Sequence, residues 1–284
     1  MLIKLYIGFV HSFGALKMSD KVHNEVRNCK GVPDYSFYII RKKTYETALV
    51  IPVINEGGRI LQQIKNIRSE NPLVDIIIAD GGSTDGTIER LTNQSSGVVS
   101  ILIKKGPGKL SAQLRMAFHY CLENDYKYVI TMDGNNKDGP EGIEKIRRAL
   151  ESGFDFVQGS RFILGGEAVN TPKKRSLAIR YVHAPITSFA AGRRFTDTTN
   201  GFRGLSRRLI ESKDIGIYRD VFQSYELVFY LPIRATKMNY RVTEVAVRRN
   251  YPSNGPTPTK IIGVFSYLNL IQILLKASIG RYNP

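Results

Sequence analysis

The tripeptide Asp133-Gly134-Asn135 carries the residue types of a divalent-cation site. It directly follows Tyr128 to Met132, a short apolar stretch that reads as a β-strand, so one carboxylate and one amide lie at alternate positions past a strand end. Oxygen ligands suit Mg²⁺ or Mn²⁺, ions that neutralise the phosphates of a nucleotide diphosphate and help it depart. The same residue types also dominate turns. Spacing alone therefore leaves a metal site and a plain turn open.

Three further polar clusters each follow a predicted strand, and they are Asn55-Glu56, Asp80 with Ser83 and Asp85, and Gly106 to Lys109. In parallel sheets ligands collect beyond the carboxyl ends of the strands, so we expect these clusters to meet at one rim. For Asp85-Gly86, turn chemistry is the favoured interpretation.

The segment Gly106-Pro107-Gly108-Lys109 resembles part of a nucleotide-triphosphatase phosphate loop. The Walker pattern needs a glycine where Ile103 stands and a serine or threonine where Leu110 stands. This sequence therefore excludes the Walker type of phosphate loop.

The elements that must position these side chains alternate between strand and helix. Continuous β-branched runs predict strands at Thr47 to Val53, Val74 to Ala79, Val98 to Lys104 and Tyr128 to Met132. Helical periodicity predicts helices at Gly58 to Ser69, Thr87 to Asn93 and Leu110 to Cys121. The alternation predicts an α/β fold with a mainly parallel central sheet and helices on both faces.

Composition predicts an anionic partner. The chain has 284 residues and a formal charge of +16, with 41 lysines and arginines against 25 acids. No helix-turn-helix, zinc-finger or RNP pattern is present, so nucleic acid is not expected; an acidic membrane surface or a phosphate-bearing substrate remains. The 2 cysteines and 4 histidines are scattered, which argues against a disulfide framework or an imidazole-bound metal.

Three segments are predicted: an N-terminal extension (1–44), a catalytic domain (45–250), and a loop with a C-terminal apolar helix (251–284). The apolar run Leu5 to Val10 is too brief for a secretory signal. The apolar stretch Ile261 to Leu275 is too short to cross a bilayer. Its basic flanks suit an interfacial position on anionic lipid, while packing on the core or on a second subunit stays open.

The order of motifs resembles family-2 glycosyltransferases of the GT-A fold. The matching elements are Pro52 to Glu56, Ala79 to Thr87, Gly106 to Lys109 and Met132 to Asn135. Downstream, Gly159-Ser160-Arg161-Phe162 and Asp197 to Arg203 resemble elements of the dolichyl- or polyprenyl-phosphate hexosyltransferase branch.

The resemblance implies roles for individual residues. Asp133 and Asn135 would hold Mg²⁺ or Mn²⁺, and Asp133 would be catalytic. Arg161 and Arg203 would approach phosphate, for which a guanidinium is well suited. Donor contacts are implied at Pro52, Asn55, Glu56, Asp80, Gly81, Ser83, Lys109 and Lys137. Three positions depart from the family pattern: Gly81 replaces a second aspartate, Asn135 replaces an aspartate, and Lys137 replaces a metal-side ligand.

The acceptor decides whether a catalytic base is needed. A sugar hydroxyl normally needs a carboxylate to remove its proton as it attacks. A lipid phosphate is already anionic, so it needs only positively charged groups to orient it. The second half of the chain is rich in such groups: Lys173, Lys174, Arg175, Arg180, Arg193, Arg194, Arg203, Arg207 and Arg208. This favours phosphate. Glu226 and Asp197 are the candidate bases, and an ion-pair role for Glu226 is equally open. In the resembling branch a loop closes over the site where Arg248 to Lys260 stand here, which implies phosphate contacts at Arg249 and Lys260; a solvated linker to the last helix is the alternative.

We therefore expect an inverting glycosyltransferase that moves a hexose from a nucleotide-diphosphate sugar to a polyprenyl phosphate at the cytoplasmic face of a membrane. A growing glycan is the alternative acceptor. A nucleotidyltransferase, or a non-catalytic basic protein that binds membrane or nucleic acid, would be a different class. The sequence leaves the oligomeric state, the base and the sugar of the donor open.

Overall fold

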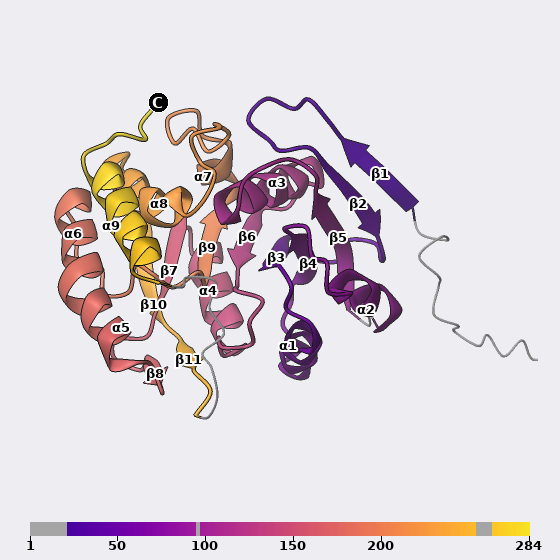
Figure 1. The fold of residues 1–284 in the computed structure, drawn as a ribbon, viewed down its shortest axis with the longest axis horizontal. Coiled ribbons are helices and arrows are strands. Elements are labelled where there is room, and N and C mark those ends of the chain that lie inside the picture. Colours follow the sequence, from indigo (N-terminus) through magenta and orange to yellow (C-terminus); the bar gives the residue numbers. More distant parts are fainter. Residues whose placement is uncertain (1–21, 95–96, 254–262) are drawn as a thin grey trace, which may run out of the picture.

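The computed structural model describes residues 22–94, 97–253 and 263–284. A sheet of nine strands runs through the centre, with the strand order β1-β2-β5-β4-β3-β6-β9-β7-β10, and a two-stranded sheet pairs β11 with β8 (Figure 1). The strands are β1 (Val22–Val26), β2 (Tyr35–Ile39), β3 (Thr47–Val53), β4 (Asp75–Asp80), β5 (Val98–Lys104), β6 (Tyr128–Thr131), β7 (Phe156–Ser160), β8 (Glu167–Val169), β9 (Arg203–Ser206), β10 (Val242–Ala246) and β11 (Arg248–Asn250). The helices are α1 (Gly58–Ser69), α2 (Thr87–Gln94), α3 (Leu110–Glu123), α4 (Gly142–Glu151), α5 (Lys173–Ala178), the π-helix η2 (Ile179–His183), α6 (Ala184–Ala191), α7 (Arg207–Glu211), α8 (Glu226–Lys237) and α9 (Val264–Ser278).

The middle of the large sheet is parallel. β3 pairs in parallel with β4 and with β6, and β4 pairs in parallel with β5. β9 is inserted antiparallel between β6 and β7. The α/β fold expected from the sequence, mainly parallel with helices on both faces, is confirmed.

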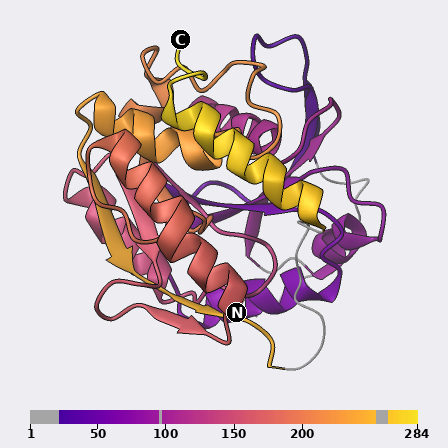
Figure 2. The ribbon, with the colours of Figure 1, turned by 60° about the vertical axis from the view of Figure 1, so that its left-hand side comes forward.

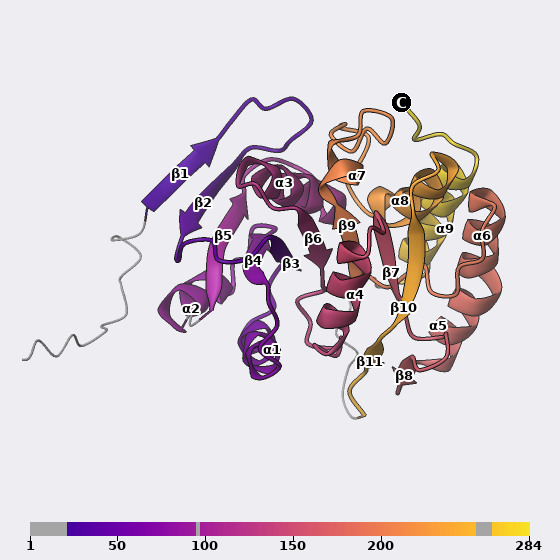
Figure 3. The same ribbon diagram turned by 180° about the vertical axis from the view of Figure 1, so that it is seen from behind.

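Strand β3 shows why these strands are continuous apolar runs. Its residues Ala48 and Val50 belong to one hydrophobic core, together with residues of α3, α8 and α9. Its residues Leu49, Ile51 and Val53 belong to a second core, together with residues of α1 and α4. Seen from behind, α1 and α4 cover that second face (Figure 3). A strand covered on both faces has no solvated side, so every position favours an apolar residue.

The segment expected as an N-terminal extension contributes to the central sheet. β2 pairs antiparallel with β5, and β1 pairs antiparallel with β2. Tyr35 of β2 is 2% exposed and belongs to the first core. The apolar run Leu5 to Val10 lies outside the described residues.

The C-terminal half adds an outer layer of helices. Figure 2 shows α9 and the continuous helix α5–η2–α6 lying in front of α8. α9 packs Leu270, Ile273, Leu274 and Ala277 into the first core. The structure describes the expected loop from Arg248 to Ser253, of which Arg248–Asn250 form β11, and Lys260 lies outside the described residues. Within the described chain, no helix combines the length and the apolar character that crossing a bilayer requires.

Candidate active site

The loop after β6 is fixed from two sides. The Gln63 side chain of α1 donates to the Asp133 carbonyl at 2.9 Å, and it accepts from the Asn136 backbone N–H at 2.8 Å. A Cβ added to Gly134 would lie 2.7 Å from Val53 Cγ1, so only glycine fits this approach to the end of β3. The Asp133 side chain is thereby held at the carboxyl end of the sheet.

The Asp133 carboxylate belongs to an ion-pair group. Arg249 donates to Asp133 at 2.8 Å and to Asp138 at 2.5 Å. Burial alone would raise the pKa of Asp133, but Arg249 and Lys137 outweigh it and hold that pKa below its usual value. Burial raises the pKa of Asp138, opposed by Arg249. Asp133 therefore carries an ionised carboxylate at neutral pH.

The residues around Asp133 fit a divalent cation that is shared with a diphosphate. The Oδ1 atom of Asn135 is buried and has no hydrogen-bond partner, which is the state expected of a ligand oxygen awaiting its ion. Among the described residues, no three His, Cys, Asp or Glu side chains gather into a complete metal cage. Mg²⁺ commonly uses one or two carboxylates together with substrate phosphates and water, so such a cage is not required.

The loop after β4 is organised by Asp80. Its buried carboxylate accepts from the backbone N–H of Gly82 at 2.8 Å and from the Ser83 hydroxyl at 2.5 Å. Ser83 in turn accepts from the Asn55 backbone N–H at 2.9 Å, and Asn55 accepts from Thr84 N–H at 2.8 Å. These bonds tie the loops after β3 and β4 together, and they give Asp80, Ser83 and Asn55 a part in shaping the rim.

The Asp80 and Asp133 loops flank the same strand end. Asp80 is the register partner of Val53, and Gly134 lies against Val53 from the other side. Gly81 donates its backbone N–H to the Val53 carbonyl at 2.9 Å. The neighbouring side chain of Gln113 donates to the Val53 and Ala79 carbonyls at 2.9 and 2.8 Å. Asp80 and Asp133, which are 53 positions apart in the sequence, thus lie on loops that share one rim.

The other residues that the resemblance implies as donor contacts have different surroundings. Pro52 lines a pocket together with Asp133. Glu56 accepts from Arg59 at 3.0 Å. The Lys109 side chain is exposed, and its backbone N–H donates to the Gln223 carbonyl at 2.7 Å. The structure does not bring Lys109 into contact with Asp133.

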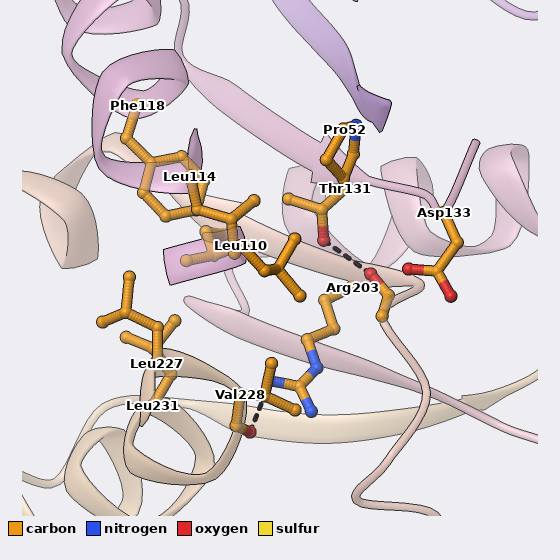
Figure 4. A pocket seen from close by; sticks show the side chains of 12 residues that line it. Pro52, Leu110, Leu114, Phe118, Thr131, Asp133, Arg203, Leu227, Val228 and Leu231 are labelled. Carbon is orange, nitrogen blue, oxygen red and sulfur yellow. Dashed lines mark hydrogen bonds between the residues drawn. The ribbon is translucent and has the colours of Figure 1, made fainter. Parts of the chain in front are cut away.

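The pocket beside Asp133 is largely apolar (Figure 4). Its lining comes from the ends of β3, β6 and β9 and from helices α3 and α8. Thr131 donates to the Gly201 carbonyl at 2.7 Å on one wall. A Cβ on Gly201 would lie 2.5 Å from Asp133 Oδ1, so glycine makes room for the carboxylate. Figure 4 shows Asp133 at one end of this pocket and Leu110, Leu114 and Phe118 at the other.

Arg203 is engaged entirely by backbone. Its guanidinium donates to the carbonyls of Asn200, Val228 and Thr198 at 2.9, 2.7 and 2.9 Å. Burial lowers the pKa of Arg203 to about 10, against the raising effect of Asp197 and Asp133. This geometry favours a role in holding the chain around residue 200 over the phosphate contact expected from the sequence.

Both candidate bases are also engaged. Asp197 is fully buried and accepts from Arg161 Nε at 2.6 Å and Nη2 at 2.9 Å. Glu226 lies in the first turn of α8 and accepts from the Ser224 backbone N–H at 2.5 Å, as an acid at a helix N-terminus does. In both cases the carboxylate oxygens already accept hydrogen bonds from the protein, which does not suit a general base that must take a proton from the acceptor. The expected catalytic roles of Asp197 and Glu226 therefore lack support in the geometry.

A group of four cations surrounds Tyr251. Arg175 donates to the Tyr251 hydroxyl at 3.1 Å, and Lys137 Nζ lies 4.8 Å from the ring centroid. Burial would raise the pKa of Tyr251, but Arg249, Arg175, Arg161 and Lys137 lower it to about 8. Burial, with Arg249, also lowers the pKa of Lys137 to about 8. Buried charges are normally paired, so four cations around one neutral phenol favour the binding of an anion between them.

One donor atom in this cationic group has no partner. Arg161 is 3% exposed, and its Nη1 atom is buried without a hydrogen-bond acceptor, whereas its other nitrogens hold Asp197. Buried guanidinium nitrogens are normally paired. The sequence resemblance pointed to Arg161, but it singled out neither Tyr251 nor Asp138 nor Gln63. Asp138 stands three positions after the tripeptide Asp133-Gly134-Asn135, and this nearness in the sequence is the one signal that could have pointed to it.

Known proteins resemble this chain in sequence and in fold. It is 26% identical over 209 residues to a polyprenol monophosphomannose synthase of Mycolicibacterium smegmatis, covering 72% of this chain and 78% of the relative. It is 24% identical over 200 residues to an undecaprenyl-phosphate mannosyltransferase of Micrococcus luteus, covering 70% and 81%. Its fold matches glucosyl-3-phosphoglycerate synthase from Mycobacterium tuberculosis, crystallised with Mn²⁺, uridine diphosphate and phosphoglyceric acid, with a TM-score of 0.58, 17% identity, and coverage of 83% and 78%.

The match to a known family covers more than half of the chain. Residues 48–212 match the family described as glycosyl transferase family 2. This stretch runs from β3 to the residue after α7 and contains the Asp133 loop, Arg161 and Asp197. The chain, an enzyme of the GT-A fold, therefore belongs to glycosyl transferase family 2.

Proposed function

We propose that this enzyme transfers a hexose from a nucleotide-diphosphate sugar to a polyprenyl phosphate, with inversion at the anomeric carbon. One observation carries the choice of acceptor: both candidate bases are held by hydrogen bonds within the fold, while four cations gather around Tyr251, and one of them, Arg249, also pairs with Asp133. A phosphate oxygen needs no base, because it is already ionised, and it needs cations to hold it. The two bacterial relatives, named for polyprenyl phosphates, support the same acceptor.

The donor would lie along the rim formed by the loops after β3, β4 and β6. Pro52, Asn55, Glu56, Asp80, Gly81 and Ser83 line or shape this rim on the nucleoside side. Asp133 and Asn135 would hold Mg²⁺ or Mn²⁺ there, an ion that stabilises charge on the departing diphosphate. Arg249 and Lys137 lie beside Asp133 and add positive charge on the same side.

The acceptor phosphate would lie in the cationic group. Arg161 offers a buried, unpaired N–H through Nη1, and Arg175 and Lys137 contribute further charge around Tyr251. One acceptor oxygen forms the new bond to the anomeric carbon as the bond from that carbon to the diphosphate breaks. The nucleoside diphosphate leaves on the opposite side. No proton has to move in this step, which agrees with a site whose nearby carboxylates are held in ion pairs.

The acceptor also implies where the enzyme works. A polyprenyl phosphate is held in a membrane by its hydrocarbon chain, so its phosphate is reached from the bilayer surface. We place the enzyme at the cytoplasmic face of a membrane, where nucleotide sugars are available.

Product analysis tests the proposal. Purified enzyme is incubated with a panel of labelled nucleotide sugars, Mg²⁺ or Mn²⁺, and one of three acceptors: a polyprenyl phosphate, the matching polyprenol without phosphate, or an oligosaccharide. We expect a glycosylated lipid and a nucleoside diphosphate with the polyprenyl phosphate alone. Transfer to the oligosaccharide or the polyprenol would overturn the choice of acceptor. Release of pyrophosphate would instead identify a nucleotidyltransferase.

A further inference from the structure

Two helices expose large apolar side chains to solvent. On the continuous helix α5–η2–α6 these are Leu177, Tyr181 and Phe189, which are 55%, 72% and 90% exposed. On α9 and at Ile279, the residue that follows it, the most exposed are Phe265 and Ile279, at 87% and 80%, followed by Leu268 at 56%. Scattered single apolar residues are normal on protein surfaces, but a group on adjacent helices marks an interaction site.

Each helix is amphipathic, so the exposed residues form one side of it. Along α5–η2–α6, the exposed positions 177, 181, 185 and 189 recur every four residues. The opposite side buries Ile179, Ala184 and Ala191. Along α9, Phe265, Leu268, Leu275 and Ile279 face outward, while Leu270, Ile273, Leu274 and Ala277 enter the core. Among the residues that the structure describes, neither row of exposed side chains is covered by another part of the fold.

The two helices that carry the exposed rows lie on the same side of the molecule. α6 packs against α9, and both pack against α8, which lies beneath them. Figure 2 shows the two helices together at the front of the molecule, and Figure 1 shows them at the end opposite β1, β2 and α2. We call Leu177, Tyr181, Phe189, Phe265, Leu268 and Ile279 the two-helix surface.

The charge around the two-helix surface has one sign. The exposed charged residues on or just after these helices are all basic: Lys173, Lys174, Arg180, Arg193, Arg194, Lys276 and Arg281. The sequence has no acidic residue between Glu167 and Asp197, and none after Glu244. An apolar row flanked by cations complements an anionic lipid surface, where the rings enter the interface and the long basic side chains reach the headgroups. Two copies of this surface would instead bring like charges together.

We propose that the two-helix surface docks this enzyme onto an anionic lipid bilayer. The binding itself follows from the exposed side chains, while its purpose, delivery of a lipid-linked acceptor, rests on the proposed function.

The helix that would lie on the lipid also reaches the cationic group. Arg175 of α5 turns inward and donates to the Tyr251 hydroxyl at 3.1 Å, whereas Leu177, two positions on, faces solvent. The width of α5 therefore separates the lipid-facing side from the cations that we assign to the acceptor phosphate. A phosphate at the bilayer surface would enter the site beside the residues that hold the protein there.

Vesicle binding without any substrate tests the docking surface. Co-sedimentation uses vesicles of phosphatidylcholine alone and vesicles that also contain phosphatidylglycerol, both free of polyprenyl phosphate. The test variant is Phe189→Ser with Phe265→Ser, which changes two exposed side chains. The matched control is Leu73→Ser with Ile39→Ser, which changes apolar residues that are 49% and 38% exposed and lie outside the two-helix surface.

We expect the wild type and the control to bind the phosphatidylglycerol vesicles, and the test variant to bind at least about tenfold more weakly. Lys173→Gln with Lys174→Gln should weaken binding by about fivefold per lysine and reduce its dependence on salt. Equal binding of the test variant and the control would overturn the proposal. Absence of wild-type binding would overturn it too, as would a wild-type dimer in solution that the test variant converts to monomer, because the surface would then join two copies.

A soluble acceptor separates this inference from the proposed function. With a short-chain prenyl phosphate in solution, the test variant should transfer sugar as fast as the wild type. With polyprenyl phosphate in vesicles, its rate should fall in proportion to its vesicle binding. If the protein binds vesicles but transfers sugar to neither acceptor, the proposed function is contradicted. The docking surface would still be supported by the vesicle binding. An equal rate loss with both acceptors would contradict the docking role.

Discussion

Arg249 Nη2 lies 2.8 Å from Asp133 Oδ2, although the two residues are 116 positions apart in the sequence. The other terminal nitrogen of Arg249 pairs with the buried Asp138 at 2.5 Å. This arrangement keeps the Asp133 carboxylate ionised and fastens β11 to the loop after β6. In the proposed function, a diphosphate beside Asp133 would meet the same guanidinium, and Arg249 would then link donor binding to the segment that carries Tyr251.

The ion pair between Asp197 and Arg161 predicts a loss of stability when it is broken. Changing Asp197→Asn leaves the Arg161 guanidinium buried without its counter-charge, because both side chains are at most 2% exposed. Breaking a buried pair from one side costs about 3–5 kcal/mol. We therefore expect the free energy of unfolding, measured by urea denaturation, to fall by that amount.

An exposed pair provides the control for Asp197. Lys127 and Glu46 are 60% and 63% exposed, so Glu46→Gln should change stability by less than about 1 kcal/mol. A variant at Asp197 with unchanged stability but no activity would contradict the structural role and restore Asp197 as a catalytic base.

The cationic group predicts an unusual tyrosine titration. With a pKa of about 8, Tyr251 should ionise well below an ordinary tyrosine, whose pKa is 10.0, and the ultraviolet absorbance of tyrosinate should show this step in the wild type. Because the folded state loses this proton first, the contribution to stability is complete above pH 10, declines as the pH falls, and is gone below pH 8. Tyr251→Phe should remove the early step; its persistence would exclude Tyr251 as its source.

The parallel strands β3, β4, β5 and β6 could be predicted from the sequence. Thr47–Val53 and Val98–Lys104 were predicted with the bounds observed, because a strand buried on both faces is a continuous apolar run that ends at a turn. β2 gave no such signal, since Tyr35–Ile39 is only partly buried and pairs at the side of the parallel strands. The antiparallel β9 was missed because its four residues, RGLS, have no strand pattern.

The site could be predicted only in part. Turn residues after each strand pointed to one rim, because parallel strands carry their carboxyl ends to the same edge. Sequence does not show which side chains satisfy one another, however. That Arg203 would serve three carbonyls, and that Gln63 would hold the Asp133 loop from α1, depends on contacts between distant segments. Glu226, likewise, could be placed at the N-terminus of α8 only when that helix was located.

The unpaired oxygen of Asn135 predicts weaker metal binding when the side chain is removed. Asn135→Ala should raise the Mn²⁺ concentration needed for half-maximal nucleotide-diphosphate binding by at least about tenfold, since even loss of the groups that orient metal ligands costs about 10–100-fold. A thermal shift with Mn²⁺ and the diphosphate measures this without turnover. Asn136→Gly is the matched control, because that neighbouring amide contacts Asn66 and its φ of 56° suits glycine.

Removal of the metal by a chelator should abolish the activity of the wild type. Activity should be lost with EDTA and restored by Mg²⁺ or Mn²⁺. Full activity in EDTA would show that Lys137 and Arg249 provide the positive charge without a metal.

Arg203 predicts a structural phenotype. Arg203→Met would leave the carbonyls of Asn200, Val228 and Thr198 without their donor, and each buried unpaired group costs about 1–3 kcal/mol. We expect destabilisation by about 3 kcal/mol or more in urea. Arg248→Gln, which breaks a pair exposed at 50% and 57%, should stay within about 0.5 kcal/mol. A stable Arg203→Met enzyme with a raised KM for the donor would assign Arg203 to phosphate binding instead.

The central claim is that Asp133 anchors an activated sugar donor for transfer to a lipid phosphate. The most direct measurement compares wild type with Asp133→Asn, a change that keeps the shape and removes the charge, by following labelled sugar from the donor into polyprenyl phosphate. We predict a rate lower by at least about 10²-fold in a variant whose thermal unfolding shows a folded protein. Transfer by Asp133→Asn at the wild-type rate would contradict the account.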